Sequence, residues 1–321
     1  MKIRNKKIET IYKEVLDFCK DRGFLRELNK SLEVPESTRF ADKNINRYGL
    51  DVMDVVHCLV DKNRTILLVN EILSVSKKGD VILEAGIGTG ILSIAGSIKS
   101  KIVYGYEINK NVYVLAKQIK DYLTRKRLIK DNIIYNLLDA KNIDVKNKAD
   151  VIISENLYTG MFFEKQIQIV RNLKKFLKKD GLFVPSGIKS SFVLSETISR
   201  GNGIEDKLYI VSENRVYSRR LSDEVVYDDI RFKTIDSNRL IFSKKVLIKK
   251  SGIVNSVLIS SEVSLPSGKV IGRDDTEFMN NDIIIMIDKP LKVVRGNVVS
   301  VSIKYTYGSD PRIAKISINI T

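Results

Sequence analysis

The sequence predicts an α/β protein in three parts: N-terminal helices, a parallel β-sheet with helices between its strands, and a C-terminal β-rich barrel or sandwich. Three observations predict this class. Apolar residues recur at helical spacing over the first 78 residues. Short apolar runs then alternate with amphipathic stretches up to residue 185, and strand-like runs separated by turn residues follow. The expected domains are therefore residues 1–78, 79–185 and 186–321.

The N-terminal part is expected to be helical and interrupted once. Apolar residues recur at intervals of three and four over residues 8–19 and again over 52–60, and the apolar stretch 66–73 follows. Pro35 and the polar residues around it separate the first helix from the others.

The middle part is expected to contain five short strands. They are predicted at residues 81–83, 102–106, 133–138, 151–153 and 182–184. Helical stretches such as 112–123 and 167–177 lie between them. Strands that alternate with helices predict a parallel sheet with right-handed crossovers, and short all-apolar strands fit a sheet that is covered on both faces.

The last part is expected to be built of strands. They are predicted at residues 192–194, 208–211, 246–249, 257–261, 283–287, 298–305 and 313–320. Ser267-Gly268 and Arg295-Gly296-Asn297 supply turn residues, and Pro185 marks the junction with the middle part. Such a succession of strands and turns is typical of a barrel or a sandwich.

The composition excludes several kinds of protein. The chain of 321 residues is long enough to bury a core without disulfides, and Cys19 and Cys58 form neither a disulfide framework nor a metal-site spacing. His57 is the single histidine, which excludes multi-histidine zinc catalysis and any catalytic triad that does not use it. The chain shows no secretory leader and no apolar run of membrane-spanning length. We therefore expect a cytoplasmic protein without a membrane partner.

The net charge of +16 arises from 55 lysines and arginines against 39 acidic residues. A basic field attracts nucleic acid and other anions. However, the whole sequence is rich in Lys, Ile and Asn, and its basic residues are spread out. The two densest stretches, 117–130 and 165–179, are interpreted as helices with solvated faces. Nucleic-acid binding is left open but is not favoured.

A cluster of alternate glycines follows the first predicted strand. Glu84 precedes Gly86, Gly88 and Gly90, and a helical stretch begins directly after them. Glycines allow a tight turn and a close approach of a ligand to the backbone, and the N-terminus of a helix favours negative charge. A dinucleotide fingerprint requires its third glycine one residue later, where this chain has Ile91.

Two further acidic positions follow the next two predicted strands. Glu107 ends the second strand, 17 residues after Gly90, where a carboxylate can accept hydrogen bonds from both hydroxyls of a ribose. Asp139-Ala140 follows the third strand. Together with the glycines, these residues predict a nucleoside ligand; the alternative is a tight strand–helix turn in an unrelated α/β domain.

This order of features resembles the class I S-adenosylmethionine-dependent methyltransferases. The resemblance implies a Rossmann-like sheet that binds S-adenosylmethionine as cofactor without a metal. It also implies that the cofactor site consists of Glu84, Gly86, Gly88, Gly90, Glu107, Asp139 and Ala140. In such folds the acid after the third strand lies near the adenine amino group, which is the position of Asp139.

Two glutamates bracket the loop that follows the fourth predicted strand. Glu155 and Glu164 are nine residues apart, and Gly160 lies between them. If the loop closes as a hairpin, both carboxylates face one pocket, and a guanidinium is the cation that such a pair binds best. The alternative is that the two residues are a helix cap and a solvated acid in a first helical turn. Tyr158 either lines the same pocket or only packs.

The loop resembles the double-glutamate loop of the protein arginine methyltransferases, in which the same spacing occurs. It lacks the Asn/Asp-Pro-Pro-Tyr/Phe tetrapeptide of nucleic-acid amino methyltransferases. Upstream, Tyr48 and the run from Leu59 to Thr65 are similar to the N-terminal helix of the same family. This match implies that Arg64 pairs with the methionyl carboxylate of the cofactor. It also implies that Tyr48 covers the cofactor and lines the substrate pocket.

The chain departs from the family in its last part. The family carries a Thr-His-Trp loop in its C-terminal barrel, whereas this chain has no tryptophan and has Glu277-Phe278-Met279 near that position. The barrel segment is also short compared with that of the family, which puts the family's dimerisation arm in question, and a homodimer is left open.

The resemblance implies methyl transfer to arginine or another basic nitrogen of a protein, peptide or small molecule, with Glu155 and Glu164 as catalytic residues and Tyr48 and Tyr158 at the substrate. Two alternatives stay open. One is a methyltransferase of the same fold that acts on an oxygen or carbon of a small metabolite. The other is a non-catalytic protein that binds S-adenosylmethionine or nucleic acid.

Overall fold

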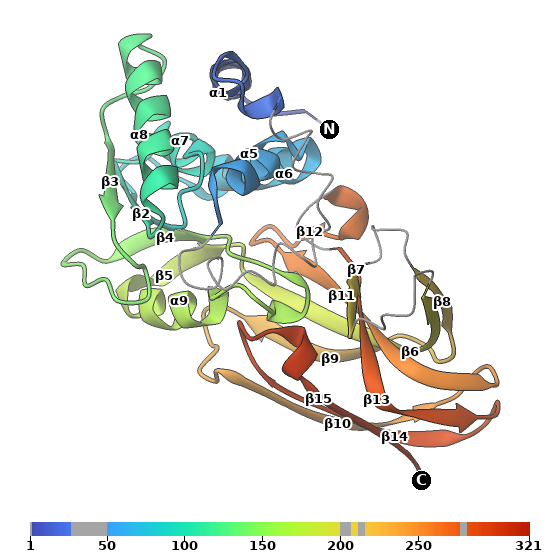
Figure 1. The fold of residues 1–321 in the computed structure, drawn as a ribbon. Helices are drawn as coiled ribbons and strands as arrows, with labels where there is room; N and C mark the ends of the chain where they lie inside the picture. Colours follow the sequence, from blue (N-terminus) through green and yellow to red (C-terminus); the bar gives the residue numbers. More distant parts are fainter. Residues whose placement is uncertain (1, 27–49, 200–206, 211–215, 277–280) are drawn as a thin grey trace.

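The structure is a computed structural model, and it describes residues 2–26, 50–199, 207–210, 216–276 and 281–321. Figure 1 shows helices α1 and α5 to α8 together in one half of the molecule and the long antiparallel strands in the other half. The helices are α1 (Lys6–Asp21), α5 (Val52–Val60), α6 (Lys62–Val75), α7 (Ile91–Ser97), α8 (Lys110–Arg125) and α9 (Gln166–Leu173), with short 3-10 turns η1 (Thr159–Met161), η2 (Lys174–Phe176), η4 (Arg273–Asp275) and η5 (Pro311–Ile313).

The middle part forms a five-stranded parallel sheet, as the sequence predicts. Its strands are β1 (Val81–Ala85), β2 (Ile102–Glu107), β3 (Ile133–Leu137), β4 (Ala149–Ser154) and β5 (Leu177–Val184), in the spatial order β3-β2-β1-β4-β5. The chain leaves β1 toward β2 on one side and returns to β4 on the other, so the strand order reverses at β1. Ligands of such sheets bind outside the carboxyl ends of the strands at this point.

Two buried apolar layers cover the sheet, one on each face. Along β1, Ile82 belongs to the layer formed with α1, α5, α7 and α8, whereas Leu83 belongs to the layer formed with α9. This alternation follows from the twofold repeat of a strand, which turns successive side chains to opposite faces. The α9 layer continues into the C-terminal strands as one hydrophobic cluster. The parallel sheet and the C-terminal strands therefore share a core.

The helices predicted in the N-terminal part are confirmed, and their ends are capped by acidic and amide side chains. Asn5 accepts hydrogen bonds at the start of α1, and Asp51 forms a capping box with Asp54 at the start of α5. Asp61 follows α5 and caps α6, where its carboxylate accepts from the Arg64 backbone N–H. Such caps stabilise a helix by about 1 kcal/mol each. The last one fixes the first turn of α6, from which Arg64 projects.

The C-terminal part consists of antiparallel strands arranged in two sheets. One has the order β7-β13-β11-β6-β8, with β9 paired to β6 and β12 paired to β11, and the other has the order β10-β14-β15. The strands are β6 (Gly187–Ser199), β7 (Leu208–Ile210), β8 (Val216–Arg220), β9 (Val225–Arg231), β10 (Arg239–Leu247), β11 (Gly252–Ser264), β12 (Val270–Ile271), β13 (Ile283–Val293), β14 (Val298–Thr306) and β15 (Lys315–Ile320).

Several sequence predictions need correction here. Strands β8 and β9 were not predicted, because their charged residues interrupt any apolar run. The strand predicted at 246–249 is only the end of β10, and Ile313 lies in a 3-10 turn that Pro311 begins. The basic stretch 165–179 is not one helix, because α9 ends at Leu173 and the chain then pairs with β4 as strand β5.

Among the described helices, none combines the length and the apolarity that a membrane span requires.

Candidate active site

A cleft at the carboxyl ends of the parallel strands brings most of the predicted site residues together. Those that line it are Arg64, Glu84, Gly86, Gly88, Glu107, Asp139, Ala140, Glu155, Tyr158 and Glu164. Gly90 lies in the same glycine turn, with its backbone against Tyr135. Tyr48 and the run Glu277-Phe278-Met279 lie outside the described residues. The sequence therefore predicted the location of the cleft, and the roles of its residues stay predictions.

The backbone of the turn between β1 and α7 favours glycine at all three positions, and close neighbours require it at Gly86 and Gly90. Gly86, Gly88 and Gly90 have φ values of +75°, +52° and +81°, in the left-handed region that favours glycine. A Cβ atom on Gly86 would lie 2.4 Å from the Asn156 side-chain oxygen, and one on Gly90 would lie 2.4 Å from the Tyr135 hydroxyl. A Cβ on Gly88 would meet only Val55, at an ordinary 3.7 Å. The face of the turn at Gly88 is therefore open to a ligand.

The carboxylate of Glu107 is fastened to this turn. Its Oε1 accepts a hydrogen bond from the Asn109 backbone N–H at 2.9 Å, and its Oε2 accepts a long one from the Gly88 backbone N–H at 3.4 Å. The side chain is 7% exposed, and its burial raises the pKa of the carboxyl. A carboxylate held beside the glycines at the end of β2 fits the hydroxyls of a ribose.

Glu84 is the most deeply buried acid of the cleft. Ser93 donates a hydrogen bond to its Oε2, whereas its Oε1 has no hydrogen-bond partner among the described residues. Burial raises the pKa of this carboxyl to about 8. An acid that is neutral at pH 7 can donate a proton to a ligand or to a neighbouring group, and the unpaired oxygen leaves a binding position free.

The buried Glu84 carboxyl is expected to make the protein less stable as the pH rises. Its pKa is about 8 in the folded protein and near 4.5 in an unfolded chain, so the folded protein holds the proton more tightly between these values. The free energy of unfolding therefore falls across this window, by up to about 1.4 kcal/mol per pH unit. Glu84→Gln removes this contribution, and urea unfolding at pH 5, 7 and 9 measures it.

The exposed Glu262→Gln variant is the control and should follow the parent at each pH. If the free energy of unfolding of Glu84→Gln falls with pH as steeply as that of the parent, the pH dependence does not arise from the Glu84 carboxyl.

Arg64 and Glu155 form a buried ion pair on the wall of the cleft. Their side chains are 8% and 7% exposed. Arg64 also donates from Nη1 to the Cys58 carbonyl at 3.0 Å, and its Nε has no hydrogen-bond partner among the residues that the structure describes. Cys58 itself lines the cleft, and burial raises the pKa of its thiol. The resemblance predicts that Arg64 binds the cofactor and Glu155 the acceptor; here the two side chains contact each other.

Glu164 projects into the same cleft without an ion-pair partner in the described part of the chain. Burial, together with the nearby carboxylates of Asp54 and Glu107, raises the pKa of its carboxyl to about 7, against the opposing charge of Lys165. The cleft thus gathers acids from β1, β2, the segment after β3 and the loop after β4, and Asp54 of α5 lies near enough to act on Glu164. Such an excess of negative charge favours a cationic guest.

The residues between the two glutamates adopt an unusual backbone. Gly160 has a φ of +65°, and Met161 and Phe163 have φ values of +56° and +55°, which non-glycine residues rarely adopt. Each such non-glycine residue costs about 1–3 kcal/mol and persists only where its surroundings hold it. We refer to residues 155–164 as the acidic loop.

The sequence analysis missed three residues that lie in or beside the cleft and the acidic loop. Asp54 raises the pKa of Glu164, and Asn156 donates to the Ala85 carbonyl at 3.0 Å beside the glycine turn. Gln166 is fully buried and joins both ends of the acidic loop: its side chain accepts from the Asn156 backbone N–H at 3.0 Å and donates to the Ser154 carbonyl at 2.7 Å. In the sequence, Gln166 could have been noticed as a polar residue on the apolar face of a short helix.

Comparisons with known proteins give consistent results. The family model "Ribosomal protein L11 methyltransferase (PrmA)" matches residues 62–201. An uncharacterized protein of Methanocaldococcus jannaschii is 27% identical over 267 residues, covering 81% of this chain and 94% of that protein. Protein arginine N-methyltransferase 2 of Xenopus laevis is 33% identical over 138 residues, covering 40% of this chain and 30% of the relative.

Among solved structures, the Trypanosoma brucei PRMT1 enzyme–prozyme heterotetrameric complex with AdoHcy has a similar fold. Its TM-score is 0.62 at 15% identity, over 83% of this chain and 92% of that chain.

Proposed function

We propose that the chain is a class I S-adenosylmethionine-dependent methyltransferase, similar to the protein arginine methyltransferases, and that it transfers a methyl group to arginine or another basic nitrogen. The acceptor belongs to a protein, a peptide or a small molecule. One observation carries the proposal: the carboxylates of Glu155 and Glu164, from the two ends of the acidic loop, line the cleft that also contains the glycine turn.

The residues of the glycine side of the cleft fit the cofactor. Gly88 leaves the turn open, Glu107 stands beside it for the ribose, and the unpaired Nε of Arg64 is available to a carboxylate. When bound there, S-adenosylmethionine supplies a methyl group that the positive sulfonium has already activated. The protein's task is then to place the acceptor nitrogen in line with it, which alone can lower the barrier by several kcal/mol.

The acidic loop orients the acceptor. Glu155 and Glu164 can each accept hydrogen bonds from a guanidinium, and charge-assisted bonds of this kind are among the strongest in proteins. Methylation replaces one N–H of the acceptor by N–CH₃, so one proton must leave that nitrogen. We assign Glu164 to receive it, because burial raises the pKa of this carboxyl to about 7 and the group is ionised or protonated with equal ease near neutral pH.

The remaining parts of the proposal concern organisation. We propose that residues 79–185 bind the cofactor and that residues 186–321 form a barrel-like substrate-binding domain. Residues 1–78 would contribute Arg64 and Tyr48 to the site. We propose that the protein acts in the cytoplasm, as a monomer or a homodimer.

A second candidate is a ribosomal protein as the methyl acceptor. It is favoured by the match of residues 62–201 to the ribosomal protein L11 methyltransferase model.

The test is an assay with the purified full chain and methyl-labelled S-adenosylmethionine. The acceptors are an arginine-rich peptide, a lysine-rich peptide of equal length, free arginine and a ribosomal protein fraction. We expect methylarginine after acid hydrolysis of the product. Label recovered only on oxygen or carbon, or cofactor binding without transfer to any acceptor, would refute the proposal. Nucleic-acid affinity that falls steeply with salt would favour the non-catalytic alternative.

A further inference from the structure

The backbone of one residue at the centre of the acidic loop, Gly160, is held by two side chains of the C-terminal sheets. The backbone N–H of Gly160 donates to the Ser261 hydroxyl at 2.9 Å, and the Gly160 carbonyl accepts from the Tyr305 hydroxyl at 2.7 Å. Ser261 lies on β11 and Tyr305 on β14, which belong to different sheets. Both hydrogen bonds are buried, so water does not replace either of them readily.

The two anchoring side chains are themselves fixed. The Ser261 and Ser190 hydroxyls are 2.8 Å apart, across the pair of strands β11 and β6. The Tyr305 and Tyr227 hydroxyls are 3.2 Å apart, and the Tyr305 ring packs against that of Phe162 with 4.3 Å between centroids. Neither anchor can therefore move away without disturbing its own buried partners.

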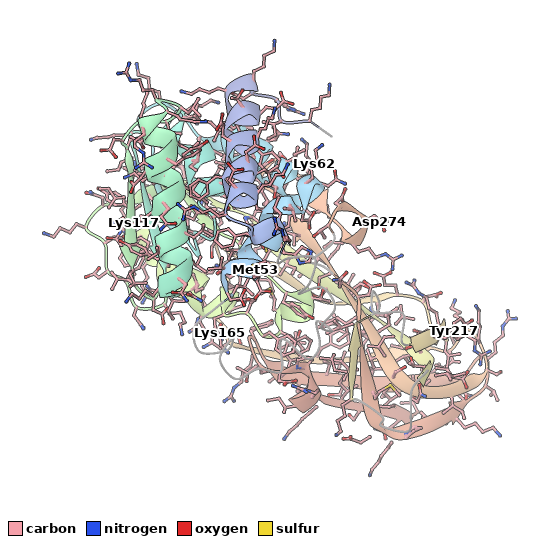
Figure 2. The ribbon with its side chains drawn as sticks, turned by 45° about the horizontal axis from the view of Figure 1, so that its top comes forward. Met53, Lys62, Lys117, Lys165, Tyr217 and Asp274 are labelled. Carbon is pink, nitrogen blue, oxygen red and sulfur yellow. The ribbon has the colours of Figure 1, made fainter. Side chains whose placement is uncertain are left out.

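Further contacts hold the second half of the loop. The Gly308 backbone N–H donates to the Met161 carbonyl at 2.7 Å, and the Phe163 backbone N–H donates to the Ser309 carbonyl at 3.0 Å. Figure 2 shows Lys165, which directly follows the loop, near the junction of the two halves of the molecule. The exposed Tyr217 marks the far end of the C-terminal half in the same view. Strands β11 and β14 and the turn after β14 thus hold the middle and the second half of the loop.

The conformation of the loop explains why it needs such support. Gly160, Met161 and Phe163 all have positive φ values, and relaxation of this backbone would turn the ends of the loop. These ends carry Glu155 and Glu164. A Cβ atom on Gly160 would also approach the Phe162 ring to 2.6 Å and the Tyr227 hydroxyl to 3.0 Å, so the position accepts only glycine.

We infer that Ser261 and Tyr305 are positioning residues for methyl transfer: their hydrogen bonds to the backbone N–H and C=O of Gly160 hold the acidic loop in the shape that presents Glu155 and Glu164 to the acceptor. This inference rests on the proposed function. It assigns to the C-terminal sheets a part in the reaction, since neither residue lines the cleft. The C-terminal sheets thus support the acceptor site without lining it.

The test compares Tyr305→Phe and Ser261→Ala with matched controls. Tyr307→Phe removes a hydroxyl from a neighbouring tyrosine, which donates to Asp228 instead of the loop. Ser195→Ala removes a fully buried serine hydroxyl whose partner is Ser256. For each variant one measures the melting temperature, the cofactor Kd, the kcat and acceptor KM of methyl transfer, and amide hydrogen exchange of the peptide that spans residues 155–165.

Tyr305→Phe and Ser261→Ala are expected to speed exchange in the loop and to lower kcat/KM for the acceptor on the order of 10- to 100-fold, as when a catalytic group moves by about 1 Å. The cofactor Kd should stay within about twofold, and the controls should keep parental kinetics whatever their melting temperatures. Unchanged loop exchange, or faster exchange with parental kinetics, would overturn the inference. A parent that transfers no methyl group to any basic acceptor would instead refute the proposed function.

Discussion

Replacing Glu164 by glutamine is expected to lower methyl transfer to arginine about 100- to 1,000-fold, the cost of removing one partner from a buried charge pair. Glutamine has nearly the same shape but carries no charge and cannot receive a proton. Glu164 forms no ion pair within the described residues, so its replacement leaves no other charge unpaired. Cofactor Kd and melting temperature should therefore change little. Steady-state kinetics with an arginine-rich peptide and cofactor titration measure the two effects separately.

The same residue should set the pH dependence of the reaction. The Glu164 carboxyl, with its pKa near 7, is protonated and neutral at lower pH, so acceptor binding and proton removal both weaken there. The parent rate should rise with pH up to about 7, by at most about tenfold per pH unit, and then level off. This rise should be absent from Glu164→Gln and retained in the exposed control Glu262→Gln. A glutamine variant that keeps the parental rate and profile would rule out the assigned role.

Glu155→Gln tests the other carboxylate less cleanly. It also weakens the ion pair with Arg64, whose guanidinium would be left in a site where its side chain is 8% exposed. A lower melting temperature is therefore expected together with the loss of transfer, and the kinetic loss has to be corrected for the fraction that is folded.

Gly88→Val is expected to weaken cofactor binding at least about 100-fold, equivalent to about 2.7 kcal/mol. The branched side chain would occupy the open face of the glycine turn, where the structure leaves ordinary contact distance only to Val55. Gly86 and Gly90 are poorer choices, because a Cβ at either position would collide with Asn156 or Tyr135 and disturb the fold itself. Calorimetric titration with S-adenosylmethionine measures the effect.

The control for this variant is Gly296→Val. Gly296 also has a positive φ, of +93°, and its Cβ would meet nothing within 4 Å. The Gly296→Val substitution therefore imposes a backbone strain of about 1–2 kcal/mol, as Gly88→Val does, but does not place a side chain near the cleft. Its cofactor affinity should be parental. An unchanged affinity in Gly88→Val, with the control also unchanged, would refute the assignment of the glycine turn to the cofactor.

Local patterns were sufficient to predict the parallel sheet and most of the predicted residues that line the cleft. The strand at Val81, the glycines after it, and Glu107 at the end of the next strand are each encoded over a few residues, because backbone geometry repeats over such distances. The spacing of Glu155 and Glu164 likewise indicated one loop. Strands β8 and β9 were not predicted, since charged residues on an exposed sheet face leave no periodic apolar signal.

Only the tertiary structure decided how these side chains are paired and held. It joined Glu155 to Arg64, which lies two helices and four strands earlier in the chain, and it tied Gly160 to Ser261 and Tyr305. A serine and a tyrosine inside strands carry no motif, and their partners are chosen when distant elements pack. The sequence by itself determined most of the acidic and glycine positions that reach the cleft, because these follow short local patterns. Their charges and orientations depend on burial and on contacts between remote residues, which only folding brings together.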